Sequence, residues 1–244
     1  MSVRQRADRL LVERGLFDSR AKAQAAIAAG LVTADDMPVR KPSDEVAVDA
    51  RLTAAPAFPW VSRGGVKLAH ALDQFAIEIA DHVCLDVGAS TGGFSEVLAE
   101  KGARRVYAVD VGRDQIHPRL RNDPRIVSIE ETDIRGLDPA RIAERPDVVV
   151  IDVSFISLRH VLPAALRLAA PRMHLLALVK PQFEVAQRRH LKKGIVRDPA
   201  QHAAVCADMA AFIASLGCEA VTTFPSPITG SDGNREFFIG AHRG

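Results

Sequence analysis

The stretch that most constrains the fold is Val83–Phe94, where an apolar run reaches an aspartate and then breaks into a glycine-rich turn. Gly88, Gly92 and Gly93 have no Cβ atom, so a ligand can touch the main chain there. The residues that follow are helix formers, so the turn opens onto a helix N-terminus with unpaired N–H groups. The pattern predicts a nucleotide-type binding turn. Asp86, at the end of the strand, is available to a cationic or hydroxyl-bearing ligand.

After this turn, short apolar runs alternate with helical patterns. The pattern predicts strands at 105–110, 126–129, 147–152, 175–179, 219–224 and 236–240, and helices at 158–169 and 199–216. Such alternation predicts an α/β fold, a doubly wound and mostly parallel sheet with an antiparallel last strand and helices on both faces. Asp86, Asp110, Asp152 and Lys180 lie at or next to strand ends. Because ligands bind beyond the carboxyl ends of such strands, we expect these four side chains to share one cleft.

The length of 244 residues allows one such domain and a smaller unit. We predict a small α+β unit at 1–50, a proline-containing linker at 51–61 and the large α/β domain at 62–244. The three cysteines form no Cys-x-x-Cys pair and the histidines have no ligand spacing, so we expect neither disulfides nor a metal site. No apolar run approaches the length of a membrane span, and the N-terminus lacks a signal-peptide core, so we expect a cytoplasmic protein.

The N-terminal unit is predicted to contain helices at 8–16 and 20–29, followed by short strands at 31–33 and 46–48. The net charge of +2 is too small to indicate a nucleic-acid partner, but Lys and Arg exceed Asp and Glu in this unit. Ser19-Arg20, Ala23, Ile27, Gly30-Leu31-Val32 and Lys41-Pro42 together resemble the S4-type RNA-binding motif. The resemblance implies that the second helix and the following hairpin present basic side chains to structured RNA.

A second basic region, residues 187–197, lies shortly after Lys180. A charge run is usually a solvated loop, but its place beside the expected cleft favours a role in positioning an RNA backbone. The residues predicted to contact RNA in both regions and near the linker are Arg4, Arg6, Arg20, Lys22, Lys41, Arg63, Arg188, Arg189, Lys192 and Lys193.

The glycine-rich turn also indicates the cofactor. The dinucleotide fingerprint Gly-x-Gly-x-x-Gly is incomplete because position 90 is not glycine, whereas Asp-x-Gly-x-x-x-Gly-Gly-Phe resembles the S-adenosylmethionine turn of Rossmann-like methyltransferases. Asp110, about 20 residues after the turn, is expected to bind the ribose hydroxyls, and Asp133 the adenine amino group. The residues expected to bind the cofactor are Asp86, Gly88, Ser90, Thr91, Gly92, Gly93, Phe94, Asp110, Asp133 and Asp152.

Four further positions indicate the reaction. Lys67, Asp152, Lys180 and Glu236 resemble the Lys-Asp-Lys-Glu set of the FtsJ-like ribose 2′-O-methyltransferases. The sequence Asp-Val-Ser-Phe after the fourth strand differs from the Asn/Asp-Pro-Pro-aromatic motif of amino methyltransferases, which disfavours a base amine as target. Together with the S4-type motif, the ordered motifs from Val-Ser-Arg-Gly-Gly-x-Lys-Leu to Gly-Asn-x-Glu-Phe resemble the TlyA family. The resemblance implies methylation of a ribose 2′-hydroxyl, at a cytidine, with ribosomal RNA or ribosomal subunits as partners.

The chemistry explains why these residue types are needed. A ribose hydroxyl is a poor nucleophile near neutral pH, so an enzyme must orient it and accept its proton. We predict that Lys180 is the base, because it directly follows an apolar strand, and that Asp152 and Glu236 hold the lysines and the hydroxyl in place. Two alternatives are a membrane-acting haemolysin, the older label of the family, and a non-catalytic RNA-binding or ribosome-assembly factor. The complete four-residue set argues against the second.

Overall fold

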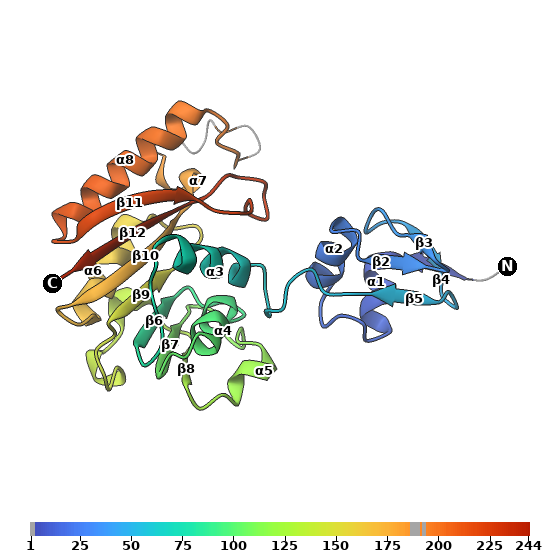
Figure 1. Cartoon of the computed structure of the whole chain (residues 1–244), viewed down its shortest axis with the longest axis horizontal. Coiled ribbons are helices and arrows are strands. Elements are labelled where there is room, and N and C mark those ends of the chain that lie inside the picture. Colours follow the sequence, from blue (N-terminus) through green and yellow to red (C-terminus); the bar gives the residue numbers. More distant parts are fainter. Residues whose placement is uncertain (1–2, 186–190, 192–193) are drawn as a thin grey trace. The chain divides into compact units, whose positions relative to one another are not determined.

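The computed structural model describes residues 3–185, 191 and 194–244, and it divides the chain into two compact units, Met1–Pro59 and Trp60–Gly244 (Figure 1). The units are described separately below. Their core residues form separate hydrophobic clusters, one in the first unit and two in the second.

The first unit packs two helices against short strands. Its elements are β1 (Arg4–Arg6), α1 (Ala7–Glu13), α2 (Arg20–Ala28), β2 (Val32–Ala34), β3 (Met37–Pro38), β4 (Glu45–Ala47) and β5 (Leu52–Ala54). Strand β1 pairs with β4, and β2 lies between β3 and β5. Helix α2 begins where the sequence predicts, because the Ser19 hydroxyl accepts a hydrogen bond from the Lys22 N–H.

Three of these strands, β1, β3 and β5, are absent from the sequence-based expectation. The predicted linker at 51–61 begins too early. Leu52–Ala54 forms strand β5, which pairs with β2 and belongs to the sheet of the first unit. The segment has prolines only after residue 54, so its β-forming residues Leu52 and Thr53 remain free to pair. The boundary between the units is therefore later than residue 50.

The second unit contains a seven-stranded sheet. Its strands are β6 (Val83–Val87), β7 (Arg105–Val109), β8 (Ile126–Ile129), β9 (Val148–Ile151), β10 (Met173–Val179), β11 (Glu219–Pro225) and β12 (Phe237–Arg243), in the spatial order β11-β12-β10-β9-β6-β7-β8. Strand β12 runs opposite to the other six strands, so its pairs with β10 and β11 are antiparallel, while the pairs from β10 to β8 are parallel. The predicted doubly wound sheet with an antiparallel last strand is confirmed.

Helices cover both faces of this sheet. They are α3 (Gly64–Gln74), α4 (Gly93–Glu100), α5 (Pro118–Arg121), α6 (Leu158–Leu168), α7 (Pro181–Glu184) and α8 (Pro199–Ser215), with short 3-10 turns at Ile134–Gly136 and Pro139–Arg141. Alternate strand residues serve the two faces: Leu85 packs in the core with α6 and α8, whereas Cys84 packs in the core with α3 and α4. The central strands β6 and β9 are therefore buried on both sides, whereas the edge strand β11 is largely exposed.

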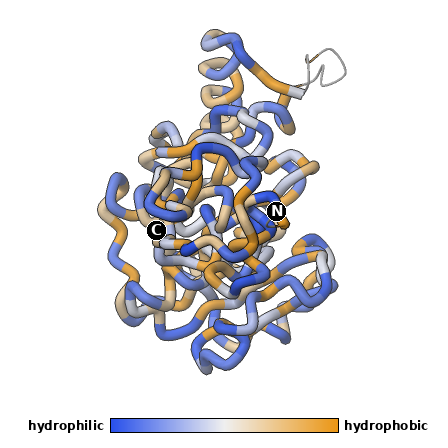
Figure 2. Tube along the Cα trace, turned by 90° about the vertical axis from the view of Figure 1, so that its right-hand side faces the viewer, coloured by the Kyte–Doolittle hydropathy of each residue, from blue (hydrophilic) through white to orange (hydrophobic). Residues whose placement is uncertain are grey.

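Helix α8 buries only one side. His202, Cys206, Met209 and Ile213 face the sheet at intervals of three or four residues. In Figure 2, hydrophobic and hydrophilic colours alternate along this helix at the top of the view. All three cysteines are buried and unpaired, and burial raises the pKa of Cys206 to about 11.

Candidate active site

The glycine-rich turn between β6 and α4 uses left-handed backbone conformations. Gly88, Ser90 and Gly92 have φ angles of 85°, 48° and 93°. A Cβ atom at position 88 would lie 2.4 Å from the main-chain oxygen of Asp152, so only glycine lets the turn pass this close to the end of β9. Position 90 adopts the left-handed conformation even though it is serine, a strained state typical of functional sites.

Asp110, at the end of β7, holds this turn in place. Its Oδ2 accepts a hydrogen bond from the Ser90 N–H at 2.8 Å, and its Oδ1 accepts one from the Gly112 N–H at 2.7 Å. Each carboxylate oxygen retains a further lone pair. Asp110 can therefore accept hydrogen bonds from the hydroxyl groups of a ligand while it keeps its hydrogen bonds to Ser90 and Gly112.

A pocket of about 290 Å³ opens beside the turn, at the carboxyl ends of β6, β7, β8 and β9. Its wall includes Gly88, Asp110, Asp133, Asp152 and the exposed Val111. The volume lies close to the lower end of the range for small-molecule sites, and the mixture of apolar wall and few polar groups suits a nucleoside. The cofactor-binding edge predicted for a doubly wound sheet is thus where the pocket lies.

Asp86 is fully buried beneath this edge. Its Oδ2 accepts a hydrogen bond of 2.7 Å from the Ser95 hydroxyl, while its Oδ1 has no hydrogen-bond partner. Burial, together with the nearby carboxylates of Asp152 and Asp110, raises the pKa of Asp86 to about 7. An unpartnered buried oxygen and two neighbouring carboxylates favour a ligand with positive charge, as S-adenosylmethionine has.

The raised pKa of Asp86 gives a testable pH dependence. An unfolded aspartate ionises near pH 4 and folded Asp86 near pH 7, so the free energy of unfolding should fall as pH rises between these values, by on the order of 3–4 kcal/mol. Asp86→Asn should remove this decline and, without cofactor, be the more stable protein at pH 8. Urea unfolding at pH 5 and pH 8 measures the effect. An equal fall in the free energy of unfolding between pH 5 and pH 8 in both proteins would contradict the expectation.

The same titration should affect the cofactor. Asp86 is largely neutral at pH 6 and ionised at pH 8, so we expect S-adenosylmethionine to bind more tightly to the natural protein as pH rises through 7. Asp86→Asn should bind more weakly at pH 8 and show little of this rise. Calorimetric titration at both pH values checks the expectation.

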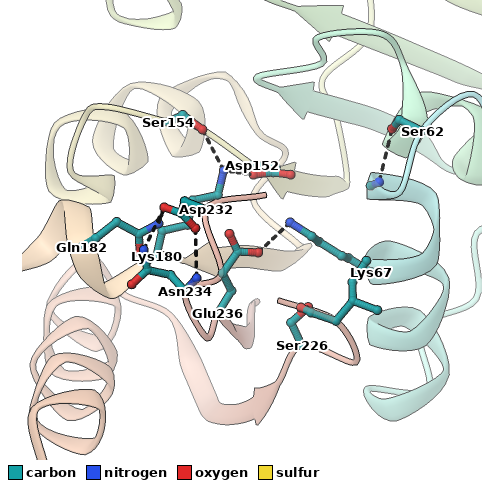
Figure 3. A network of polar contacts seen from close by, with 12 residues as sticks. Ser62, Lys67, Asp152, Ser154, Lys180, Gln182, Ser226, Asp232, Asn234 and Glu236 are labelled. Carbon is teal, nitrogen blue, oxygen red and sulfur yellow. Dashed lines mark hydrogen bonds and ion pairs between the residues drawn. The ribbon is translucent and has the colours of Figure 1, made fainter. Parts of the chain in front are cut away.

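The four residues Lys67, Asp152, Lys180 and Glu236 come together as two ion pairs (Figure 3). Lys67 Nζ lies 2.6 Å from Glu236 Oε2, and Lys180 Nζ lies 2.5 Å from Asp152 Oδ1. Lys67 stands in the first turn of α3, where the helix dipole opposes a cation, and the buried Glu236 carboxylate compensates for that position. The other oxygen of Glu236 packs against Gly230, where a Cβ atom would lie only 2.6 Å away.

Lys180 directly follows β10 and is held from two sides. Besides Asp152, the Ser154 hydroxyl accepts a hydrogen bond from its Nζ at 2.9 Å. The Lys180–Asp152 contact has the distance of an ion pair but not the geometry of a hydrogen bond. The Lys180 side chain is only 10% exposed, so its amine is fixed at the edge of the pocket to which Asp152 and Ser154 also belong.

Asn234 connects the loop before β12 with the chain that precedes α8. Its side chain is fully buried: Nδ2 donates to Gly194 O at 3.1 Å and to Asp232 Oδ2 at 2.8 Å, while Oδ1 accepts from the Val196 N–H at 2.9 Å. Gln182, two residues after Lys180, also donates to Asp232 (Figure 3). These bonds fix the position of Glu236 relative to Lys180.

An exposed aromatic ring lies next to the ion pairs. Phe155 is 85% exposed, has a φ of 67° and contacts the ring of Phe183 with centroids 5.3 Å apart. A left-handed backbone is unusual for a bulky residue and is found mostly at functional sites. The strained turn presents this ring at the mouth of the pocket.

Several residues expected to bind the cofactor have other contacts. Phe94 is buried and its ring stacks on Phe238, so its side chain belongs to the core and not to the pocket wall. Gly93 packs against Ser62, and the carbonyl of Thr91 accepts the His117 N–H. Asp133 lines the pocket, and Arg135 donates hydrogen bonds to both of its oxygens and lowers the pKa of this carboxyl.

The residues expected to bind RNA fall into three groups. Arg4, Arg6, Arg20, Lys22 and Lys41 belong to the first unit, where Lys22 pairs with Asp18 at 3.1 Å. Arg63 directly precedes α3. Arg188, Arg189, Lys192 and Lys193 lie outside the residues that the structure describes.

Sequence reasoning missed some of the site. Ser154, Ser95 and Asn234 were not among the predicted residues, although Ser154 and Asn234 lie inside the motifs Asp-Val-Ser-Phe and Gly-Asn-x-Glu-Phe. Those motifs were the available signal. Nothing in the local sequence indicates that Ser95, on α4, faces Asp86.

Comparisons with known families match both units. The model of the FtsJ-like methyltransferase family matches residues 60–243, and the model of the S4 domain matches residues 5–52. The two matches follow one another along the chain.

Individual known proteins also match the chain over nearly its whole length. The 16S/23S rRNA (cytidine-2'-O)-methyltransferase TlyA of Mycobacterium tuberculosis is 46% identical over 98% of this chain and 90% of its own. Hemolysin A of Brachyspira hyodysenteriae is 35% identical over 95% of this chain and 97% of its own. The solved "putative hemolysin" of Streptococcus thermophilus has a TM-score of 0.78 and 37% identity, covering all of this chain and 90% of that one.

Two candidate properties find no support among residues 3–185, 191 and 194–244. None of the helices there has the length and apolar character that a membrane span requires. No three His, Cys, Asp or Glu side chains there are arranged to hold a metal ion.

Proposed function

Because the chain belongs to the TlyA family, in which an S4 domain precedes an FtsJ-like methyltransferase domain, we propose that it methylates a ribose 2′-hydroxyl of ribosomal RNA, at a cytidine, with S-adenosylmethionine as donor. The Mycobacterium tuberculosis relative, at 46% identity, is a 16S/23S rRNA (cytidine-2'-O)-methyltransferase. A protein that modifies ribosomal RNA works where ribosomes are, in the cytoplasm.

One observation carries the proposal: the pairs Lys67–Glu236 and Lys180–Asp152 lie near one another (Figure 3), and Asp152 also lines the pocket that suits the cofactor. Ser154, which accepts a hydrogen bond from Lys180, lines the same pocket. This arrangement suits a reaction in which a hydroxyl must be oriented and deprotonated.

Each residue has a chemical task in this proposal. S-adenosylmethionine supplies an electrophilic methyl group on a sulfonium, which leaves as a neutral thioether. Lys180, as the neutral amine, accepts the proton of the 2′-hydroxyl while the hydroxyl oxygen forms its new bond to carbon. Asp152 and Ser154 hold Lys180 in line, and the Lys67–Glu236 pair fixes the far side of the hydroxyl site.

The cofactor site is assigned on the same grounds. Gly88 and Ser90 bring main-chain atoms to the ligand, Asp110 receives the ribose hydroxyls, and Asp86 faces the cationic end. Asp133 is the candidate for the adenine amino group. Phe155 offers an exposed ring on which a nucleotide base can stack.

The test uses methyl-labelled S-adenosylmethionine with purified ribosomal subunits and with the protein-free rRNA. We expect label in RNA, resistant to alkaline cleavage at the modified nucleotide, because a 2′-O-methyl group blocks attack by the neighbouring oxygen. A labelled methyl group on a base, or no transfer of label to either substrate, would contradict the proposal. A dye-leakage assay with phospholipid vesicles separates it from the haemolysin reading.

A further inference from the structure

In the first unit, a single buried carboxylate organises two arginines. Asp8, at the start of α1, has a fully buried side chain, whereas the side chains of Arg6 and Arg20 are 40% and 49% exposed. Arg6 comes from β1 and Arg20 from the first turn of α2. Three elements of the unit therefore meet at one carboxylate.

The hydrogen bonds fix how both guanidinium groups point. Arg6 donates through Nε to Oδ1 and through Nη2 to Oδ2, both at 3.1 Å. Arg20 donates to the same Oδ2 through Nη2 at 2.7 Å and Nε at 3.2 Å, and Gln24 donates to it at 2.8 Å. Because both arginines contact one oxygen atom, their guanidinium groups are held side by side.

The free edges of these arginines can still bind an anion. Each uses only its Nε–Nη2 edge for Asp8, so the Nη1 group of each remains available for a phosphate oxygen. Two guanidinium groups and one carboxylate leave a net positive charge at a half-exposed surface. The Asp8 N–H donates to Pro42 O at 3.2 Å, which ties the loop that carries Lys41 to the same place.

We propose that Asp8 is a positioning residue that builds a two-arginine site for the phosphate backbone of structured RNA. The proposal deepens the proposed function, because it rests on ribosomal RNA being the partner of this unit. Side chains fixed before binding lose less conformational entropy on binding than free arginines do. The hydrogen bond from Arg6 also holds the pKa of Asp8 well below its ordinary range, so the carboxylate stays ionised at physiological pH.

The direction in which Asp8→Asn changes the affinity for RNA distinguishes a positioning role from an effect of net charge. Asp8→Asn removes a negative charge next to RNA, so net electrostatics alone predicts tighter binding. Positioning predicts the reverse, about tenfold weaker binding, since the neutral amide keeps only one acceptor oxygen and turns an N–H group toward a guanidinium. It also predicts a shallower salt dependence, with the slope of log K against log salt smaller by about one to two, because one or two phosphate contacts are lost.

The experiment measures binding of the full chain to a 16S rRNA transcript between 50 and 300 mM salt. Asp49→Asn is the matched control, because it removes an exposed carboxylate of the same unit and should leave binding unchanged or slightly tighter. Arg20→Lys keeps the charge but cannot make the two-point contact with Asp8, so it should also bind several-fold more weakly. Thermal unfolding of each variant shows whether the first unit is intact.

Each outcome decides something. If Asp8→Asn binds as tightly as the natural protein, or more tightly, the proposal is overturned. If Asp8→Asn unfolds the unit, Arg20→Lys decides, and unchanged affinity there overturns the fixed geometry. If the natural protein does not bind the transcript at all, it is the RNA partner of the proposed function that fails.

Discussion

Replacing Lys180 with alanine is expected to slow methyl transfer by about 10²–10⁴-fold at saturating cofactor, the usual contribution of a general base. The amine lies 2.5 Å from Asp152 and 2.9 Å from Ser154, so no other described lysine is held in the same place. Cofactor affinity should change little, because Asp86, Asp110 and the glycine-rich turn are untouched. Single-turnover transfer to ribosomal subunits, with calorimetry for the cofactor, measures both effects.

The matched control is Lys101→Ala, which removes an exposed amine paired with Asp73 at 3.1 Å away from the pocket. Its transfer rate should equal that of the natural protein. Lys180→Arg keeps a positive charge but no proton acceptor, since arginine stays protonated, and should be nearly as slow as alanine. Normal turnover in Lys180→Ala would show that Lys180 is not the base.

Replacing Glu236 with alanine is expected to lower the free energy of unfolding of the second unit by about 3–5 kcal/mol, the usual cost of breaking a buried ion pair. Lys67 and Glu236 are only 9% and 3% exposed, so the substitution leaves the Lys67 ammonium buried without its partner. Transfer should also fall, because Lys67 loses its fixed position. Urea unfolding with a probe in the second unit measures the stability change.

A double variant tests the cause. Lys67→Met/Glu236→Leu replaces the pair with apolar side chains of similar volume, so it should recover most of the lost stability while remaining inactive. Recovery of stability without activity would separate the structural and catalytic effects of the pair. Equal destabilisation of the single and double variants would mean that packing around Gly230, not the ion pair, sets the cost.

The sequence predicts the architecture of the second unit well because its signals are local. Most strands are short apolar runs, and the glycine-rich turn at 88–93 requires backbone conformations that few other residues tolerate. The four residues of the two ion pairs were found through motifs, each read separately. Their pairing into Lys67–Glu236 and Lys180–Asp152 is visible only in three dimensions.

What the sequence does not predict depends on contacts between distant residues. The sequence of Leu52–Ala54 carries no clear strand pattern, and this segment forms strand β5 because it pairs with the open edge of β2. Phe94 belongs to the glycine-rich motif, yet its direction is set by Phe238 in the last strand. Asp8 looks like any acidic residue in a first helical turn, and only its burial between two arginines gives it a role.

The antiparallel direction of β12 has a consequence for what the end of the chain contributes to the second unit. The first residues of β12 lie at the same edge as the end of β10, so Glu236, which directly precedes β12, meets Lys67 across 169 positions of chain. Phe238 in β12 also stacks on Phe94 in α4, the helix that follows the glycine-rich turn. The proposed catalytic set and the helix behind the cofactor turn therefore depend on the same strand.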